Sequence, residues 1–144
     1  MTLERIKIEW WGPYNVDSLL QEYDWGSHDF RIYVITRKWG RVSKSILYIG
    51  QTYTRDFGQR IVEHESWIRE ERGSVKIRLG YVILERGRIS SAERLWDIEN
   101  LLVYATQPKY NVQFKRGYYD RELKIVNLKR RGPLPIQIDS RNYA

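Results

Sequence analysis

Two side chains four residues apart, Arg60 and His64, could together bind a phosphate group. Apolar residues at helical spacing follow a connector at residues 52–55, and they predict an α-helix to about residue 72, ended by Gly73, with Trp67 on the same stripe. Side chains four apart lie one turn above each other on the same helix face. A guanidinium is a rigid cationic fork for phosphate oxygens, and an imidazole one turn away could donate to the same phosphate or position water. The alternative is an ordinary surface cation beside a semi-buried histidine.

The carboxylate of Glu99 is a third candidate, because it lies on or beside the apolar stripe of a second predicted helix. This helix covers residues 90–106, and Ser90 and Glu93 have the spacing of a capping box at its start. A carboxylate on the core side of a helix needs a partner, either a metal ion or an ion-pair cation. Mg²⁺ prefers oxygen ligands and keeps most of its waters, so that one carboxylate could hold it.

Two tyrosines, Tyr33 and Tyr48, lie on two strands predicted over residues 30–36 and 46–49. The polar connection is too short for a crossover helix, and the strands are therefore predicted to be antiparallel neighbours. A third strand is predicted over residues 75–84, where alternation gives way to a continuous apolar run. Residues 1–12 alternate apolar and charged side chains and are predicted to add an edge strand, with Trp10 and Trp11 covering the core.

The order of these residues resembles the GIY-YIG nuclease family. The two half-motifs of its signature correspond to Arg31-Ile32-Tyr33 and Tyr48-Ile49-Gly50. Members have an arginine in the next helix, often a histidine or tyrosine one turn later, a glutamate in the following long helix and an asparagine just after it. The resemblance covers about residues 30–113 and is closest to the restriction endonucleases of the family. It implies a catalytic set of Tyr33, Tyr48, Arg60, His64, Glu99 and Asn111.

The resemblance implies an α+β fold, a small three-stranded antiparallel sheet flanked by helices. Residues 1–144 would form a single domain with its core at about 29–113, an N-terminal extension and a basic C-terminal extension over 114–144. It also implies a Mg²⁺-dependent DNA endonuclease, with Mn²⁺ as an alternative ion, Glu99 as the metal ligand and Asn111 as a supporting hydrogen-bonding group. Restriction enzymes of this family act as dimers, which suggests a homodimer.

The general base is left open between Tyr33, with Tyr48 orienting it or exchanging roles, and His64. A free tyrosine has a pKa of about 10, so that about one in a thousand is ionised at neutral pH. The site must lower that pKa, or His64 is the base. Arg31 replaces the first glycine of the signature and Gln51 stands where a lysine is common. The interval from Tyr48 to Arg60 is also slightly long.

The charge of the chain favours an anionic partner. Its 144 residues carry a net charge of +7 with a pI of about 9.7, which suits DNA. The predicted phosphate contacts are Arg31, Lys115, Arg116, Arg121, Lys124, Lys129, Arg130 and Arg131. The alternative for the basic segment is a solvated flank whose aromatic residues pack inward.

The absence of cysteine excludes disulfides and thiolate chemistry. No apolar run is long enough to cross a bilayer and no secretory apolar segment follows Met1, so we expect a cytoplasmic protein without a membrane partner. Two other functions stay open, a structure-selective nicking or repair nuclease and a non-catalytic nucleic-acid-binding module.

Overall fold

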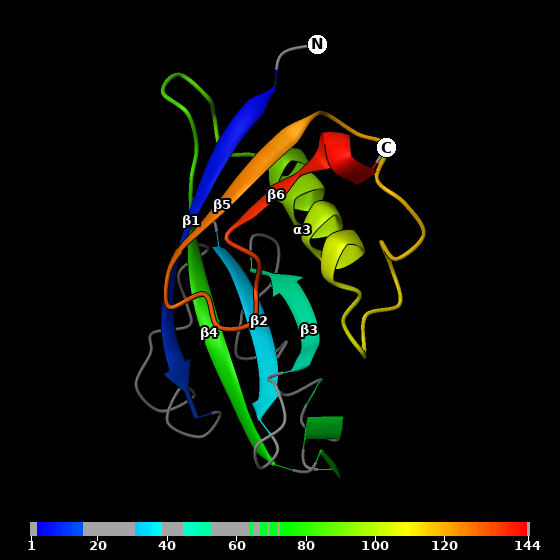
Figure 1. Cartoon of the computed structure of the whole chain (residues 1–144). Coiled ribbons are helices and arrows are strands. Elements are labelled where there is room, and N and C mark those ends of the chain that lie inside the picture. Colours follow the sequence, from blue (N-terminus) through cyan, green and yellow to red (C-terminus); the bar gives the residue numbers. More distant parts are fainter. Residues whose placement is uncertain are drawn as a thin grey trace.

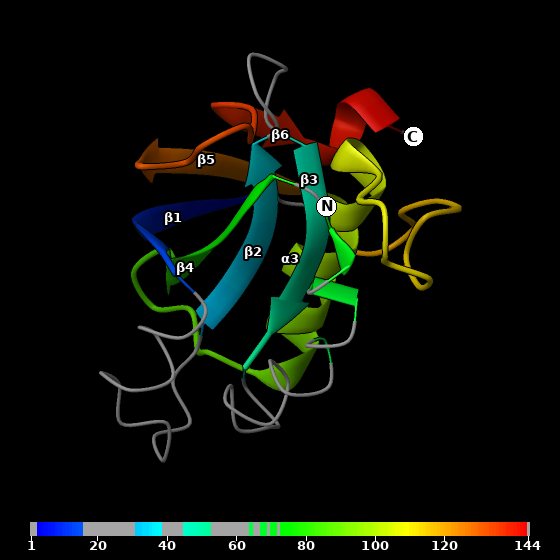
Figure 2. The same cartoon turned by 90° about the horizontal axis from the view of Figure 1, so that it is seen from below.

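A mixed sheet of six strands curls around one long helix in the computed structural model (Figure 1). The structure describes residues 3–15, 31–38, 45–52, 64, 67–68, 70–71 and 73–143. Its elements are β1 (Glu4–Tyr14), β2 (Arg31–Lys38), β3 (Ser45–Gln51), β4 (Ser74–Ile83), α3 (Ala92–Thr106), β5 (Leu123–Lys129), β6 (Gln137–Asp139) and the 3-10 helix η1 (Ser140–Tyr143). The strand order is β3-β2-β4-β1-β5-β6, and Figure 2 shows the strands as an arc with α3 on its concave side.

The predicted three-stranded sheet is present as β3-β2-β4, in which both pairings are antiparallel. The fold class inferred from the resemblance is nevertheless wrong, because these strands are only half of a larger mixed sheet. In the described part of the chain one long helix lies against this sheet, in place of several flanking helices. The local strand patterns predicted the hairpin but not that β1, β5 and β6 continue the same sheet beyond β4.

The N-terminal strand lies inside the sheet and is not the edge strand predicted for residues 1–12. β1 pairs antiparallel with β4 on one side and parallel with β5 on the other. Trp10 is buried, as predicted, and its indole N–H donates to Oδ1 of Asn127 on β5 at 2.9 Å. Trp11 has an exposed fraction of 44% and lies on the opposite face. The parallel pairing joins segments more than a hundred residues apart, a distance over which periodicity carries no information.

The segment predicted as a C-terminal extension completes the same sheet and core. It contains β5, which pairs with β1, and β6, which pairs with β5. Apolar side chains of this segment are buried with those of α3 in one cluster, namely Leu123, Ile125, Leu134 and Ile138. Residues 114–144 are therefore needed to close the core over β1.

The two faces of the sheet carry two separate clusters of buried side chains. Alternation along β2 directs Ile32 and Val34 towards α3, and Tyr33 and Ile35 towards the opposite face. Trp67, which follows the hairpin in the sequence, packs against the cluster on the opposite face. Tyr33 therefore does not face the helix that carries Glu99.

Helix α3 begins and ends by recognisable local signals. Its N-cap is Ser91, whose side chain accepts from the backbone N–H of Arg94 at 3.1 Å, one residue later than the capping box predicted from Ser90. Gln107, in the left-handed region with φ 50°, ends the helix. The described part of the chain contains no helix of the length and apolarity needed to span a membrane.

Candidate functional site

Tyr33, Tyr48 and His64 form one cluster on the face of the sheet opposite α3. The hydroxyl of Tyr33 lies 3.3 Å from Nε2 of His64, and the two tyrosine ring centroids are 6.0 Å apart. The imidazole packs most closely on Tyr48, with ring centroids 4.2 Å apart. Tyr33 and His64 are both buried. The β2–β3 hairpin and the helical turn at His64 thus bring three of the six predicted catalytic residues into contact.

Two further aromatic residues extend this cluster, Trp67 and Tyr110. The indole N–H of Trp67 donates to Nδ1 of His64 at 3.3 Å. Tyr110 stacks on Trp67 with ring centroids 4.2 Å apart and an angle of 18° between the ring planes. Trp67 continues the predicted helical stripe three residues after His64, but its spacing alone does not show that its N–H contacts the imidazole. Tyr110 directly precedes Asn111, and no pattern in the sequence predicted its place in the cluster.

The carboxylate of Glu71 fixes the position of Tyr110. It accepts from Nη1 of Arg37 at 2.9 Å, from Nζ of Lys109 at 2.6 Å and from the hydroxyl of Tyr110. Burial raises the pKa of Glu71, but the hydrogen bonds from Lys109 and Tyr110 lower it more, and the net pKa is below its ordinary value. Glu71 therefore links β2, the helical turn that carries Trp67 and the segment after α3.

Glu99 lines a pocket of about 350 Å³ together with Tyr48, Tyr110 and Asn111. Glu99 is buried in the middle of α3, as its place beside the apolar stripe predicted. Tyr48 belongs to both this pocket and the Tyr33–His64 cluster. The structure therefore brings five of the six predicted residues into one continuous region around Tyr48. Arg60 lies outside the described residues.

Asn111 braces the edge of the sheet. Its Oδ1 accepts from the backbone N–H of Ile49 at 2.9 Å, and its Nδ2 donates to the carbonyl of the same residue at 2.8 Å. The backbone N–H of Tyr110 donates to the carbonyl of Leu47 at 2.8 Å. These bonds extend β3 on its outer side and hold the rim of the pocket. The amide of Asn111 thus contacts the backbone next to Tyr48, and Asn111 also lines the same pocket as Glu99.

The donor set of the pocket fits a hydrated hard cation. Among the described residues that line it, Glu99 carries the only carboxylate. The described part of the chain has no group of three or more histidine, cysteine or acidic side chains placed to hold a metal. An ion at Glu99 would therefore keep most of its waters, which suits Mg²⁺ or Mn²⁺ and does not suit zinc.

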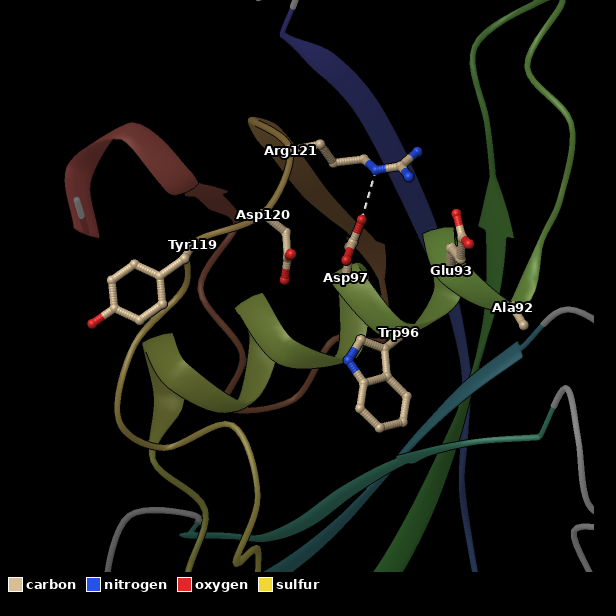
Figure 3. A pocket seen from close by; sticks show the side chains of 7 residues that line it. All are labelled: Ala92, Glu93, Trp96, Asp97, Tyr119, Asp120 and Arg121. Carbon is tan, nitrogen blue, oxygen red and sulfur yellow. Dashed lines mark ion pairs between the residues drawn. The ribbon is translucent and has the colours of Figure 1, made fainter.

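A larger pocket of about 640 Å³ lies on the outer side of α3 and was missed by the sequence analysis (Figure 3). Trp96 and Tyr119 line it together with the carboxylates of Glu93, Asp97 and Asp120. Burial raises the pKa of Asp97 to about 6, the charge of Asp120 adds to this, and the ion pair with Arg121 opposes it. With three carboxylates and one guanidinium, this pocket is a poor site for a phosphate.

The predicted DNA-contacting cations lie in separate places. Arg121 is paired with Asp97 at 2.6 Å and Lys129 with Glu9 at 2.6 Å. Arg130 and Arg131 donate to backbone carbonyls at 3.0 and 2.8 Å. Lys115 and Arg116 lie in the segment after α3, two to three residues beyond the pocket-lining Gln113. Lys124 lies on strand β5, whose seven residues span about 20 Å. The side chain of Arg31 lies outside the described residues.

Comparison with protein-family models, with curated proteins and with solved structures found no match to this chain.

Proposed function

We propose that this protein is a metal-dependent endonuclease that hydrolyses DNA phosphodiester bonds, in the manner of the restriction enzymes of the GIY-YIG family. The observation that carries the proposal is the double contact of Tyr48. Its ring packs on His64 beside Tyr33, and it also lines the pocket of Glu99. Tyr48 thus connects residues from two strands, a helical turn and α3, which are separated in the sequence.

The chemistry of phosphodiester hydrolysis gives these groups complementary roles. A water must lose a proton, charge on the non-bridging oxygens must be stabilised and the leaving oxygen must be neutralised. Tyr33 is the proposed proton acceptor, with His64 at its hydroxyl. Glu99 would hold Mg²⁺ or Mn²⁺, which supplies charge stabilisation at the phosphate. Arg60 is proposed from its place in the motif to contact the same phosphate.

The proposed working form is a cytoplasmic homodimer. A single site of this size cuts one strand at a time, so that two copies would be needed to cut both strands in one encounter. Lys115 and Arg116 follow the pocket directly in sequence and are the proposed first contacts with the DNA backbone.

The experiment that tests the proposal is incubation of the purified protein with a mixture of supercoiled DNAs in Mg²⁺ or in EDTA. Glu99→Gln is the test variant, and Glu93→Gln, an exposed acid on the same helix, is the matched control. We expect discrete fragments in Mg²⁺ that disappear with EDTA and with Glu99→Gln but persist with Glu93→Gln.

Other outcomes select the remaining functions. Nicking without discrete fragments would indicate a structure-selective nuclease. DNA binding without cleavage by the wild-type protein, over Mg²⁺ and Mn²⁺, would overturn the proposal and leave a nucleic-acid-binding module. Circular dichroism of each variant shows whether loss of cleavage reflects loss of the fold.

A further inference from the structure

We infer that Trp67 is a positioning residue that selects the tautomer of His64, so that Nε2 carries the proton and donates it in a hydrogen bond to the oxygen of Tyr33. This inference deepens the proposed function, on which its catalytic meaning rests. It assigns different roles to the two candidate bases, His64 as a hydrogen-bond donor and Tyr33 as the group that accepts a proton from water.

The argument begins with the chemistry of the indole group. The indole of tryptophan has one N–H and no acceptor nitrogen. It lies 3.3 Å from Nδ1 of His64, and Nδ1 must therefore present its lone pair. A neutral imidazole with a free lone pair at Nδ1 carries its proton at Nε2. A proton at Nδ1 would face the indole N–H, donor against donor.

The second contact of the ring then has a defined direction. Nε2 lies 3.3 Å from the hydroxyl oxygen of Tyr33, and a protonated Nε2 donates to that oxygen. A donor at this oxygen favours the phenolate over the phenol, since hydrogen bonding to the charged form stabilises it. His64 cannot also take the proton of Tyr33 through Nε2, because that nitrogen is already protonated.

The indole is itself held in place from its other face. Tyr110 stacks on Trp67, and the hydroxyl of Tyr110 donates to Glu71, which is fixed in turn by Arg37 and Lys109. The orientation of the indole N–H is therefore set by its stacking on Tyr110, which Glu71 holds in place. At metal sites, removal of the hydrogen-bond partner of a ligating histidine changes metal affinity or activity by about 10–100-fold, and we expect an effect at the lower end of that range here.

The tautomer can be measured directly, without any nuclease assay. The chain has only two histidines, His28 and His64, so that His28→Gln leaves one imidazole to observe. Long-range ¹H–¹⁵N correlation spectra at neutral pH distinguish a protonated ring nitrogen from one with a free lone pair. We expect Nδ1 of His64 to have the shift of an acceptor nitrogen and Nε2 that of an N–H nitrogen. The opposite assignment in the wild-type background would overturn the inference.

The matched variant is Trp67→Phe, which removes the indole N–H and keeps an aromatic ring against Tyr110. We expect the Nδ1 resonance to move towards the N–H range as the Nδ1–H tautomer becomes populated. An unchanged tautomer in a folded Trp67→Phe protein would show that the indole does not select it. If this variant does not fold, the spectrum of the His28→Gln protein alone decides.

The cleavage assay tests the catalytic meaning separately. We expect Trp67→Phe to lower kcat by roughly tenfold with KM nearly unchanged, because the indole lies behind the imidazole. A protein with the expected tautomer and no cleavage activity would contradict the proposed function and leave the role of Trp67 intact. A wild-type level of kcat in a variant with a changed tautomer would show that the tautomer does not govern the reaction.

Discussion

The ring of Tyr33 occupies the space that a side chain at Gly50 would need. The two residues are directly opposite each other in the antiparallel pairing of β2 and β3. A β-carbon at Gly50 would lie 2.4 Å from both Cζ and the hydroxyl oxygen of Tyr33. The glycine of Tyr48-Ile49-Gly50 thus allows the tyrosine of the other half-motif to lie across β3 and reach His64. This contact is a physical reason for the two half-motifs to occur together.

Gly50→Ala should displace Tyr33 and destabilise the fold. Inserting a methyl group into a packed site costs about 1–3 kcal/mol, and the Tyr33–His64 hydrogen bond should be lost with it. Urea denaturation measures the change in the free energy of unfolding. The control is a double-mutant cycle with Tyr33→Leu, in which Gly50→Ala should cost clearly less. Equal costs in both backgrounds would mean that the ring of Tyr33 is not the obstacle.

Glu71→Gln should lower stability at neutral pH by about 1.5–3 kcal/mol, the range for hydrogen bonds to a charged group. The folded-state pKa of Glu71 lies below its ordinary value of 4.5, so that its contribution is present above that value and is lost as pH falls through the folded-state pKa. Denaturation curves of wild type and variant should therefore converge in acid. Glu70→Gln, an exposed neighbour, should be nearly silent. A pH-independent difference would contradict this account.

Asp97→Asn should show the opposite dependence on pH. The folded-state pKa of Asp97 is raised by burial to about 6 from 3.8, and its stabilising contribution is present below 3.8 and lost as pH rises through about 6. Relative to the variant, the wild type should lose about 1–2 kcal/mol between pH 4 and pH 7, since one pKa unit corresponds to about 1.4 kcal/mol and solvent screening reduces the full value.

The control for this prediction is Asp139→Asn. The hydrogen bonds from Arg141 lower the pKa of Asp139 to about 2, so that the wild type should gain on this variant as pH rises through the acid range. Thermal or urea unfolding of all three proteins from pH 2 to pH 7 measures both trends, with the change for Asp139 below pH 4 and the change for Asp97 above it. Parallel curves for wild type and Asp97→Asn would show that this carboxyl has an ordinary pKa.

Replacing Lys115 and Arg116 together by glutamate should weaken DNA binding and flatten its dependence on salt. If both contact phosphates, the slope of log affinity against log salt should fall by about 2. The comparison is the double replacement of Lys129 and Arg130 by glutamate, at the far end of β5, where Lys129 already pairs with Glu9. We expect a smaller loss of DNA affinity for this second variant. A larger loss of DNA affinity in the Lys129 and Arg130 variant would indicate that the DNA binds away from the pocket.

The sequence predicted the elements whose pattern is local. The hairpin of β2 and β3 and the strand β4 follow from alternation, and α3 follows from its apolar stripe and a serine cap, displaced by one residue to Ser91. The burial of Glu99 follows from its place beside that stripe. These predictions depend on side chains within a few residues of one another, where periodicity is informative.

The remaining features depend on contacts that no local pattern specifies. The pairing of β1 with β5 and the bracing of Ile49 by Asn111 join residues 62 or more positions apart. The larger pocket, which Asp97 lines, forms only when the segment after α3 returns over the helix. The sequence places Trp67 on the apolar stripe of a helix. The direction of its indole N–H, however, is set by tertiary packing against Tyr110.

The interior position of β1 has a consequence for the order in which the chain can fold. During synthesis β1 emerges more than a hundred residues before β5, and in that interval one of its backbone edges has no strand to pair with. The apolar residues Ile6 and Ile8 lack their cover of Ile125 and Ile138 for the same time. A nascent chain of this protein must therefore hold an open sheet edge until its last third is made, and its high contact order favours slow folding. A fragment ending at residue 113 would keep every candidate catalytic residue and still be left in that unfinished state.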